Sequence, residues 1–226
     1  MAGQDERTRA TQDAGITELV FVVDESGSMC GLESDTIGGV NGVLGRNRQA
    51  GGTCMVTLVC FSNESRTVVD REDLAQVADL TKRDYQPGGC TALLDALGGT
   101  IEHIGRVQRY VPLGHKASHV LFVVVTDGLE NASRRYGYPQ VRRLVQAKRE
   151  EGWEFLFLGA NIDEAAEADR LGIDPACASA YVSDAAGTAV AYGAVAEASV
   201  DFREAGAVPK GWRAAPMADA ARRARR

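Results

Sequence analysis

The chain has 226 residues, of which 45% are hydrophobic and 25% are charged, as in an ordinary soluble globular protein. Its formal net charge of −6 argues against nucleic acid as the main partner, because binding to phosphates requires a basic face. No stretch approaches the roughly 20 consecutive apolar residues of a membrane span, so we expect no membrane partner either.

The amino-terminal segment and the cysteines indicate the compartment. Residues 1–15 are polar and lack the apolar core of a signal peptide, so we expect a disordered leader and a cytoplasmic protein. The five cysteines are odd in number and have no disulfide-framework spacing, which favours reduced thiols. No two cysteines form a Cys-x-x-Cys pair, so a zinc site is not expected.

The first chemical signal follows an apolar run. Residues 19–23 are apolar at every position, which predicts a strand covered on both faces in a mostly parallel sheet. Asp24, Ser26 and Ser28 then alternate just beyond the strand, at the carboxyl edge of the sheet. One carboxylate and two hydroxyls suit a hard cation such as Mg²⁺ or Mn²⁺.

The next segments continue an alternation of helices and strands. Residues 32–48 have helical apolar spacing, although four glycines lower their helix propensity. Residues 53–61 read as a buried strand, and residues 66–69 as its hairpin partner at the sheet edge. Residues 72–80 predict a short helix.

Two later segments can complete a metal site. Thr91 follows a glycine-rich turn and opens a helix with an apolar stripe. Residues 120–125 form another fully apolar strand, and Asp127 follows it. If the strands that precede Asp24 and Asp127 are neighbours, the two carboxylates face one another across the crevice where open α/β sheets bind ligands.

The remaining segments complete a doubly wound sheet of one edge strand and five others, with its crossover at the first strand. In chain order we expect a helix, a strand, a helix, a short strand and a last helix over residues 139–151, 153–159, 163–171, 180–182 and 188–205. A basic tail rich in alanine and arginine spans residues 208–226 and has little to bury. It predicts a solvated or partly helical segment, with a basic hook for an acidic partner as the alternative.

Three motifs together resemble those of a known family. They are Asp24-Glu25-Ser26-Gly27-Ser28, the single Thr91 after a glycine pair, and Thr126-Asp127-Gly128. Their order and spacing resemble the metal-ion-dependent adhesion site (MIDAS) of von Willebrand factor type A domains. The resemblance implies a domain over residues 16–207 with a Rossmann-like, three-layer α/β fold, in which helices cover both faces of an open, mostly parallel sheet with one antiparallel edge strand.

The resemblance also implies the roles of the site residues. The hydroxyls of Ser26 and Ser28 would touch the metal, while Thr91, Asp24 and Asp127 would bind it directly or through water. Mg²⁺ is the expected cation, with Mn²⁺ as the alternative and Ca²⁺ less favoured. The open coordination position would accept an Asp or Glu side chain from a partner protein, so the implied function is cation-dependent protein binding.

Small prokaryotic members of this family commonly serve in multiprotein systems, often beside ATPases or stress-response proteins, and the resemblance implies such partners here. Six loop residues are expected to surround the metal, where they could contact a partner: Glu25, Met29, Cys30, Asn131, Tyr136 and Tyr138. For the two tyrosines, a half-buried anchor of the loop is an equally good expectation.

Two other functions stay open. One is a Mg²⁺-dependent hydrolase or phosphatase that uses Asp24 and Asp127. A dehalogenase-type phosphatase, however, needs a second aspartate where this chain has Ser26, and the Gly-x-Ser-x-Gly pattern of a serine hydrolase is absent. We therefore expect no enzyme. The other alternative is a structural subunit whose metal only braces the loops.

Overall fold

A six-stranded sheet forms the centre of the computed structural model, which describes residues 15–224. The spatial order is β3-β2-β1-β4-β5-β6, and only β3 runs antiparallel to its neighbour. The expected mostly parallel sheet with an antiparallel edge strand is therefore confirmed. The strands are β1 (Ile16–Asp24), β2 (Cys54–Phe61), β3 (Ser65–Asp73), β4 (Ala117–Thr126), β5 (Glu154–Gly159) and β6 (Ala178–Ala180).

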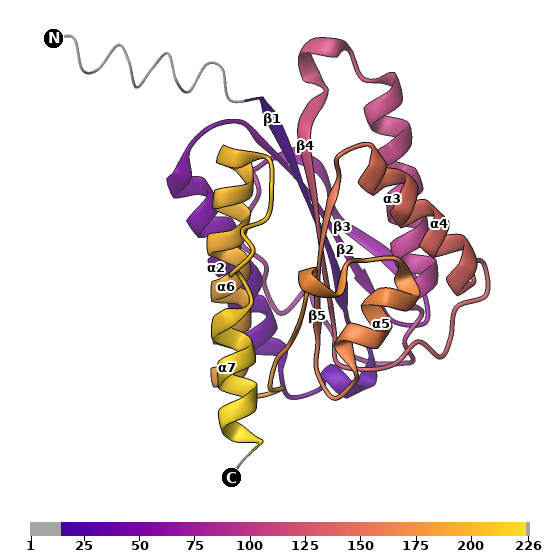
Figure 1. Ribbon diagram of the computed structural model, residues 1–226, viewed down its shortest axis with the longest axis vertical. Helices are drawn as coiled ribbons and strands as arrows, with labels where there is room; N and C mark the ends of the chain where they lie inside the picture. Colours follow the sequence, from indigo (N-terminus) through magenta and orange to yellow (C-terminus); the bar gives the residue numbers. More distant parts are fainter. Residues whose placement is uncertain (1–14, 225–226) are drawn as a thin grey trace, which may run out of the picture.

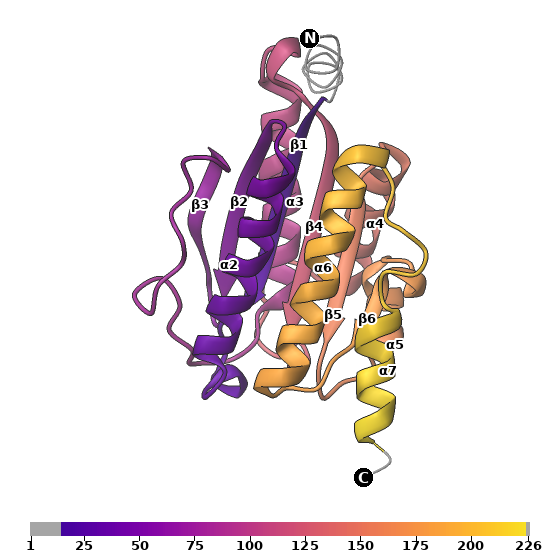
Figure 2. The ribbon, with the colours of Figure 1, turned by 90° about the vertical axis from the view of Figure 1, so that its left-hand side faces the viewer.

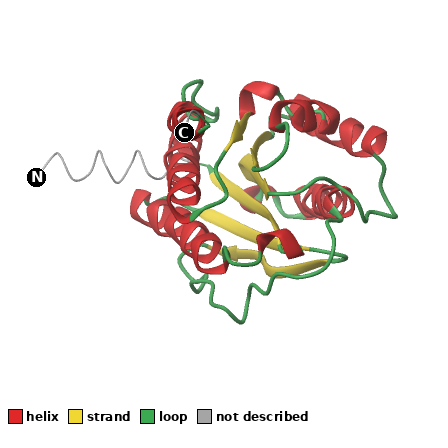
Figure 3. Ribbon diagram, turned by 90° about the horizontal axis from the view of Figure 1, so that it is seen from below, coloured by secondary structure: helices red, strands yellow, loops and turns green. Residues whose placement is uncertain are grey.

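Helices cover both faces of this sheet, which is seen edge-on between them in Figure 1. One layer contains α2 (Glu33–Ala50), α6 (Ala185–Ala205) and α7 (Ala214–Arg223), which Figure 2 shows face-on. The other layer contains α3 (Leu93–Tyr110), α4 (Tyr138–Glu150) and α5 (Glu164–Leu171). The view from below in Figure 3 shows the three layers, as expected. Short 3₁₀ turns occur at η1 (Gly27–Met29), η2 (Leu113–His115) and η3 (Pro175–Cys177).

The fully apolar run in β1 is explained by two separate cores. Phe21 and Val23 belong to the core beneath α2 and α6, whereas Val20 and Val22 belong to the core beneath α3 and α4. Because successive side chains of a strand point to opposite faces, a strand covered on both sides must be apolar at every position.

The strand order places the candidate site. From β1 the chain goes outward to β2 and β3, then crosses back to β4 on the other side of β1. Val23 of β1 pairs with Val125 of β4, so the ends of these two strands lie side by side. These carboxyl ends, at the lower end of the sheet in Figure 1, form the crevice at the switch point, and the expected crossover at the first strand is confirmed.

The predicted helix over residues 72–80 is wrong. Strand β3 continues to Asp73, and turns and irregular backbone follow it. Side chains of α2 provide the hydrogen bonds that a helix would have made. Asn41 donates to the carbonyl of Leu80 and accepts from its N–H, at 3.0 and 2.8 Å, and Arg48 donates to the carbonyl of Val77 at 2.6 Å. The apolar side chains of this segment are buried against α2 without a helix.

The structure also bears on both ends of the chain. The leader expected over residues 1–15 lies, except for Gly15, outside the described residues. The basic segment is partly helical, but Trp212 is only 7% exposed, so the expectation that it has little to bury is wrong. The indole N–H of Trp212 donates to Ala176 and the Arg213 side chain to Ala178, which ties α7 to the end of the sheet. Within residues 15–224, no helix is long and apolar enough to cross a bilayer.

Candidate metal centre

The end of β1 holds a carboxylate in a fixed orientation. Asp24 has no exposed surface. Its Oδ1 accepts the N–H of Ser26 at 2.7 Å, and its Oδ2 accepts the hydroxyl of Thr126 at 2.6 Å. The first bond closes the turn into η1, and the second joins β1 to the end of β4. Both carboxylate oxygens are therefore positioned by groups from the two central strands.

Three hydroxyl groups and a second carboxylate converge beside Asp24. The Oγ atoms of Ser26 and Ser28 are 3.1 Å apart, and the Ser28 hydroxyl donates to Oδ1 of Asp127 at 2.5 Å. The hydroxyl oxygens of Ser28 and Thr91 each lie 3.5 Å from the place where a Cβ atom on Gly128 would sit. The structure thus brings together all five residues that the sequence predicted, from three separate segments.

Thr91 is held from the loop after β4. Its N–H donates to Oδ1 of Asn131 at 2.9 Å, and its carbonyl accepts the N–H of Asn131 at 3.0 Å. Asn131, which we expected only as a possible contact for a partner, therefore also positions Thr91 in the site.

The same loop is tied to the start of α3 by two carboxylates that sequence reasoning missed. The side chain of Glu130 accepts the N–H groups of Leu94 and Ser133, at 2.9 and 2.7 Å. Asp95 accepts the N–H groups of three consecutive residues, Arg134, Arg135 and Tyr136, at 2.8–2.9 Å. For Asp95 the only available signal was its place in the first turn of a helix, where acids are favourable, and that signal does not identify residues 134–136 as its donors.

Burial and hydrogen bonding act in opposite directions on these carboxylates. Burial raises the pKa of Asp24, with a smaller contribution from the nearby charge of Asp127, although the bonds from Ser26 and Thr126 oppose the shift. Burial would also raise the pKa of Asp95, but its three N–H bonds outweigh burial and hold this pKa below the usual value.

The side chains present fit a hard divalent cation. Two carboxylates, one of them fully buried, lie close together and would be stabilised by a positive charge between them. All the converging groups are oxygens, which Mg²⁺ and Mn²⁺ prefer. Residues 15–224 contain no cluster of three or more His, Cys, Asp or Glu side chains able to hold a metal, so the hydroxyls would have to contribute.

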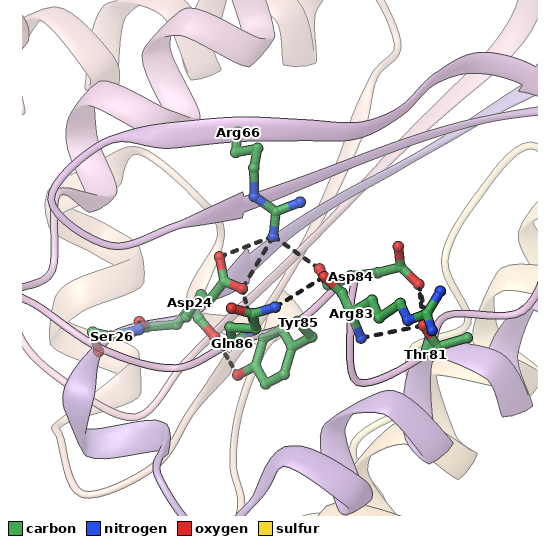
Figure 4. Close-up of polar contacts among 9 residues, drawn as sticks. Asp24, Ser26, Arg66, Thr81, Arg83, Asp84, Tyr85 and Gln86 are labelled. Atoms are coloured by element: carbon green, nitrogen blue, oxygen red, sulfur yellow. Dashed lines mark hydrogen bonds and ion pairs between the residues drawn. The ribbon is translucent and has the colours of Figure 1, made fainter.

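A second network fixes the backbone around Asp24 (Figure 4). The carboxylate of Glu25 accepts the guanidinium of Arg66 at 3.1 and 3.2 Å and also accepts the N–H of Gln86. The hydroxyl of Tyr85 donates to the carbonyl of Asp24 at 2.6 Å. These bonds hold residues 81–86 against the end of β1.

The network and burial also limit which of the six residues expected around the metal a partner can reach. Glu25 is buried and engaged by Arg66, and Met29 is buried, so the expectation that these two are available to a partner is wrong. Cys30 and Asn131 are exposed. Tyr136 is half-buried, and so is Tyr138, whose hydroxyl donates to Glu167 at 2.6 Å.

The comparison with known families now decides the classification. The model of the von Willebrand factor type A domain matches residues 18–191, which include the three segments of the candidate site. The chain belongs to the von Willebrand factor type A family. No curated protein matches the sequence.

Solved structures of type A domains share this fold at low sequence identity. The vWF domain of the type V pilus tip protein Mfa5 from Porphyromonas gingivalis has a TM-score of 0.59 and 13% identity, covering 83% of this chain and 96% of that one. The pilus adhesin SpaC from Lactobacillus rhamnosus GG has a TM-score of 0.61 and 14% identity, covering 84% of this chain and 30% of that one. The proximal thread matrix protein 1 of the mussel byssus, with a zinc-occupied MIDAS motif, has a TM-score of 0.56 and 13% identity, covering 82% of this chain and 46% of that one. This chain thus spans less than half of the last two proteins.

Proposed function

We propose that this type A domain is a protein-binding module that depends on a divalent cation. The convergence of Asp24, Ser26, Ser28, Thr91 and Asp127 on one point at the switch of the sheet carries this proposal. These five side chains are the proposed metal ligands.

The proposed mechanism follows from the donor set. Two carboxylates roughly cancel the charge of a divalent cation, and hydroxyl groups donate weakly, so a cation held by these residues would remain electrophilic and would leave a position for a partner's carboxylate. The chain's own task is to present its oxygens in one arrangement. Thr126 does this for Asp24, Asn131 for Thr91, and Ser28 for Asp127.

The donor set also favours particular cations and a particular kind of partner. We favour Mg²⁺ or Mn²⁺ over Ca²⁺, because the site offers few charged oxygens; the mussel relative shows zinc in its own MIDAS motif. The proposed partner is a cytoplasmic protein that presents an Asp or Glu side chain, rather than nucleic acid or membrane. A multiprotein system with an ATPase or stress-response components would be a suitable setting.

A non-enzymatic role agrees with the structurally similar proteins, which are a pilus tip protein, a pilus adhesin and a matrix protein. The alternative function, a structural subunit whose metal only braces the loops, has a different consequence for stability and binding. In that case removing the cation would lower stability without changing the binding of a carboxylate.

The test is calorimetric titration of the EDTA-stripped protein with Mg²⁺, Mn²⁺ and Zn²⁺. We expect one saturable site in the native chain and its loss in the near-isosteric variants Asp24→Asn and Asp127→Asn. Asp201→Asn, which changes an exposed carboxylate on α6, is the matched control and should bind normally. Equal binding by all four proteins would contradict the proposal.

A further inference from the structure

A groove with a volume of about 910 Å³ opens directly beside Thr91. One wall is the turn between β2 and β3, which includes Asn63, and the other is the loop from Asn131 to Arg135. Cys90, the residue before Thr91, forms part of the groove between them. Since Asn131 also holds Thr91 by two hydrogen bonds, the groove and the proposed metal site share a wall.

The groove contains two cationic side chains without an ion-pair partner among the described residues, although the guanidinium of Arg135 lies 5.6 Å from the centre of the Tyr136 ring. Arg134 and Arg135 are exposed, and within residues 15–224 neither guanidinium takes part in an ion pair. The neighbouring carboxylate of Asp95 is instead occupied by the backbone N–H groups of these arginines and of Tyr136. Opposite them, the turn between β2 and β3 contributes one acidic side chain, Glu64.

The groove is also rigid and has spare hydrogen-bond donors. The bonds from Asp95 and Glu130 to backbone N–H groups fix the loop that carries the arginines, so little order has to be created on binding. Asn63 and Asn131 use their side-chain oxygens to accept the N–H groups of Cys90 and Thr91. Their amide N–H₂ groups make no hydrogen bond among the described residues and can donate to the carbonyls of an extended peptide.

We propose that this groove binds an acidic segment of the partner protein next to the residue that reaches the metal. The inference rests on the proposed function and deepens it, because it states what the partner must carry besides one Asp or Glu. A second carboxylate pairs with Arg134 or Arg135, and the peptide backbone accepts hydrogen bonds from Asn63 and Asn131. On a chain with a net charge of −6, two arginines without an ion-pair partner among residues 15–224, beside the site, favour acidic partners.

The probes for the test are fluorescent glycine peptides. One carries a single Asp, and the others carry in addition one Glu at one to four residues before or after that Asp. Binding is measured with Mg²⁺ and with EDTA for the native chain and for the double variant Arg134→Gln/Arg135→Gln. The matched control, Arg106→Gln/Arg109→Gln, changes the net charge equally with two exposed arginines near the opposite end of α3.

We expect at least one spacing to lower the Kd about fivefold relative to the single-Asp peptide in the native chain and the control. The gain of the diacid peptides over the single-Asp peptide should vanish in Arg134→Gln/Arg135→Gln. The groove proposal is overturned if no spacing gives a gain, or if the gain persists in that double variant.

The two proposals fail in different ways. Single-Asp binding that is absent or insensitive to EDTA would contradict the metal-dependent function. The groove is then judged from the EDTA series alone, in which binding of a diacid peptide must still depend on the two arginines. If no peptide binds with Mg²⁺ or with EDTA, both proposals are wrong.

Discussion

Thr126 links the two carboxylates of the candidate site although it is not one of the proposed ligands. Its hydroxyl donates to Oδ2 of Asp24 at 2.6 Å and accepts the N–H of Gly128 at 3.3 Å. The first bond satisfies a fully buried carboxylate, and the second shapes the turn that presents Asp127. One hydroxyl therefore fixes the relative position of both acids.

Replacing this hydroxyl should weaken both stability and metal binding. We expect Thr126→Val to lower the free energy of unfolding by about 1–2 kcal/mol, because a buried carboxylate oxygen loses its donor. Titration should also show weaker Mg²⁺ binding. Thr126→Ser keeps the hydroxyl and is the control. Unchanged Mg²⁺ affinity in the valine variant would show that Thr126 does not position the site.

The cysteines should differ sharply in reactivity. Burial raises the pKa of Cys54 and Cys60 to about 12, whereas Cys30 and Cys90 are exposed. Since the thiolate is the reactive form, we expect iodoacetamide to label Cys30 and Cys90 in the folded protein. Cys54 and Cys60 should be labelled only after unfolding, as peptide mass spectrometry can show. Labelling of Cys54 as fast as Cys90 under native conditions would contradict the structure.

The sequence predicted the residues of the site better than their supports. Asp24 and Asp127 each end a continuous apolar run, so their place at the sheet edge followed from the pattern. The role of Glu25 could not be predicted, because its partner Arg66 lies 41 positions away on the edge strand. The three bonds that Asp95 accepts also span about 40 residues, and no local periodicity encodes them.

At the scale of elements, the loop after β4 and the start of α3 behave as one unit. Asp95 and Glu130 together accept the N–H groups of six residues across this junction. The hydroxyl of Ser133 also accepts the N–H of Asp95. These bonds fix both Thr91 and the wall of the groove that carries the two arginines.

Removing one of these carboxylates should loosen the junction. We expect Asp95→Ala to lower the free energy of unfolding by about 2–3 kcal/mol, because three N–H groups lose a charged acceptor. Amide hydrogen exchange at residues 134–136 should accelerate. Asp79→Ala removes an exposed ion pair with Arg48 and should cost about 0.5 kcal/mol or less. Equal losses in the two variants would contradict the assigned role of Asp95.

The segment after β3 shows how tertiary contacts override local pattern. Its apolar spacing predicts a helix, and Leu74, Val77 and Leu80 are indeed buried. Asn41 and Arg48 of α2 bind the backbone of this segment, so irregular structure satisfies its polar groups. Replacing the hydrogen bonds of a helix by side-chain hydrogen bonds from α2 depends on contacts between separate elements, so the sequence of the segment itself does not reveal it.

At the scale of the whole molecule, the sheet order was predictable and the packing of the last helix was not. Continuous apolar strands that alternate with helices predicted the doubly wound topology and hence the neighbouring ends of β1 and β4. The alanine and arginine composition after residue 207 gave no sign that Trp212 anchors α7 to the sheet end, since one buried side chain in a polar segment leaves no periodic pattern.

Loss of this anchor should destabilise the fold. We expect Trp212→Ala to lower the free energy of unfolding by about 3 kcal/mol, and Trp212→Phe by clearly less, because the ring still fills most of the space. Met217→Ala, at a position 41% exposed on α7, should change stability little. Urea denaturation measures all three variants. A native-like Trp212→Ala would show that α7 contributes no stability to the domain.

The most direct test of the metal site is a crystal structure of the Mn²⁺-soaked protein with anomalous diffraction at the manganese edge. We predict one anomalous peak at the carboxyl ends of β1 and β4, within bonding distance of the Ser26 and Ser28 hydroxyls. Thr91, Asp24 and Asp127 should coordinate it directly or through water. A saturated crystal with no peak there, or with its only peak elsewhere, would contradict the account.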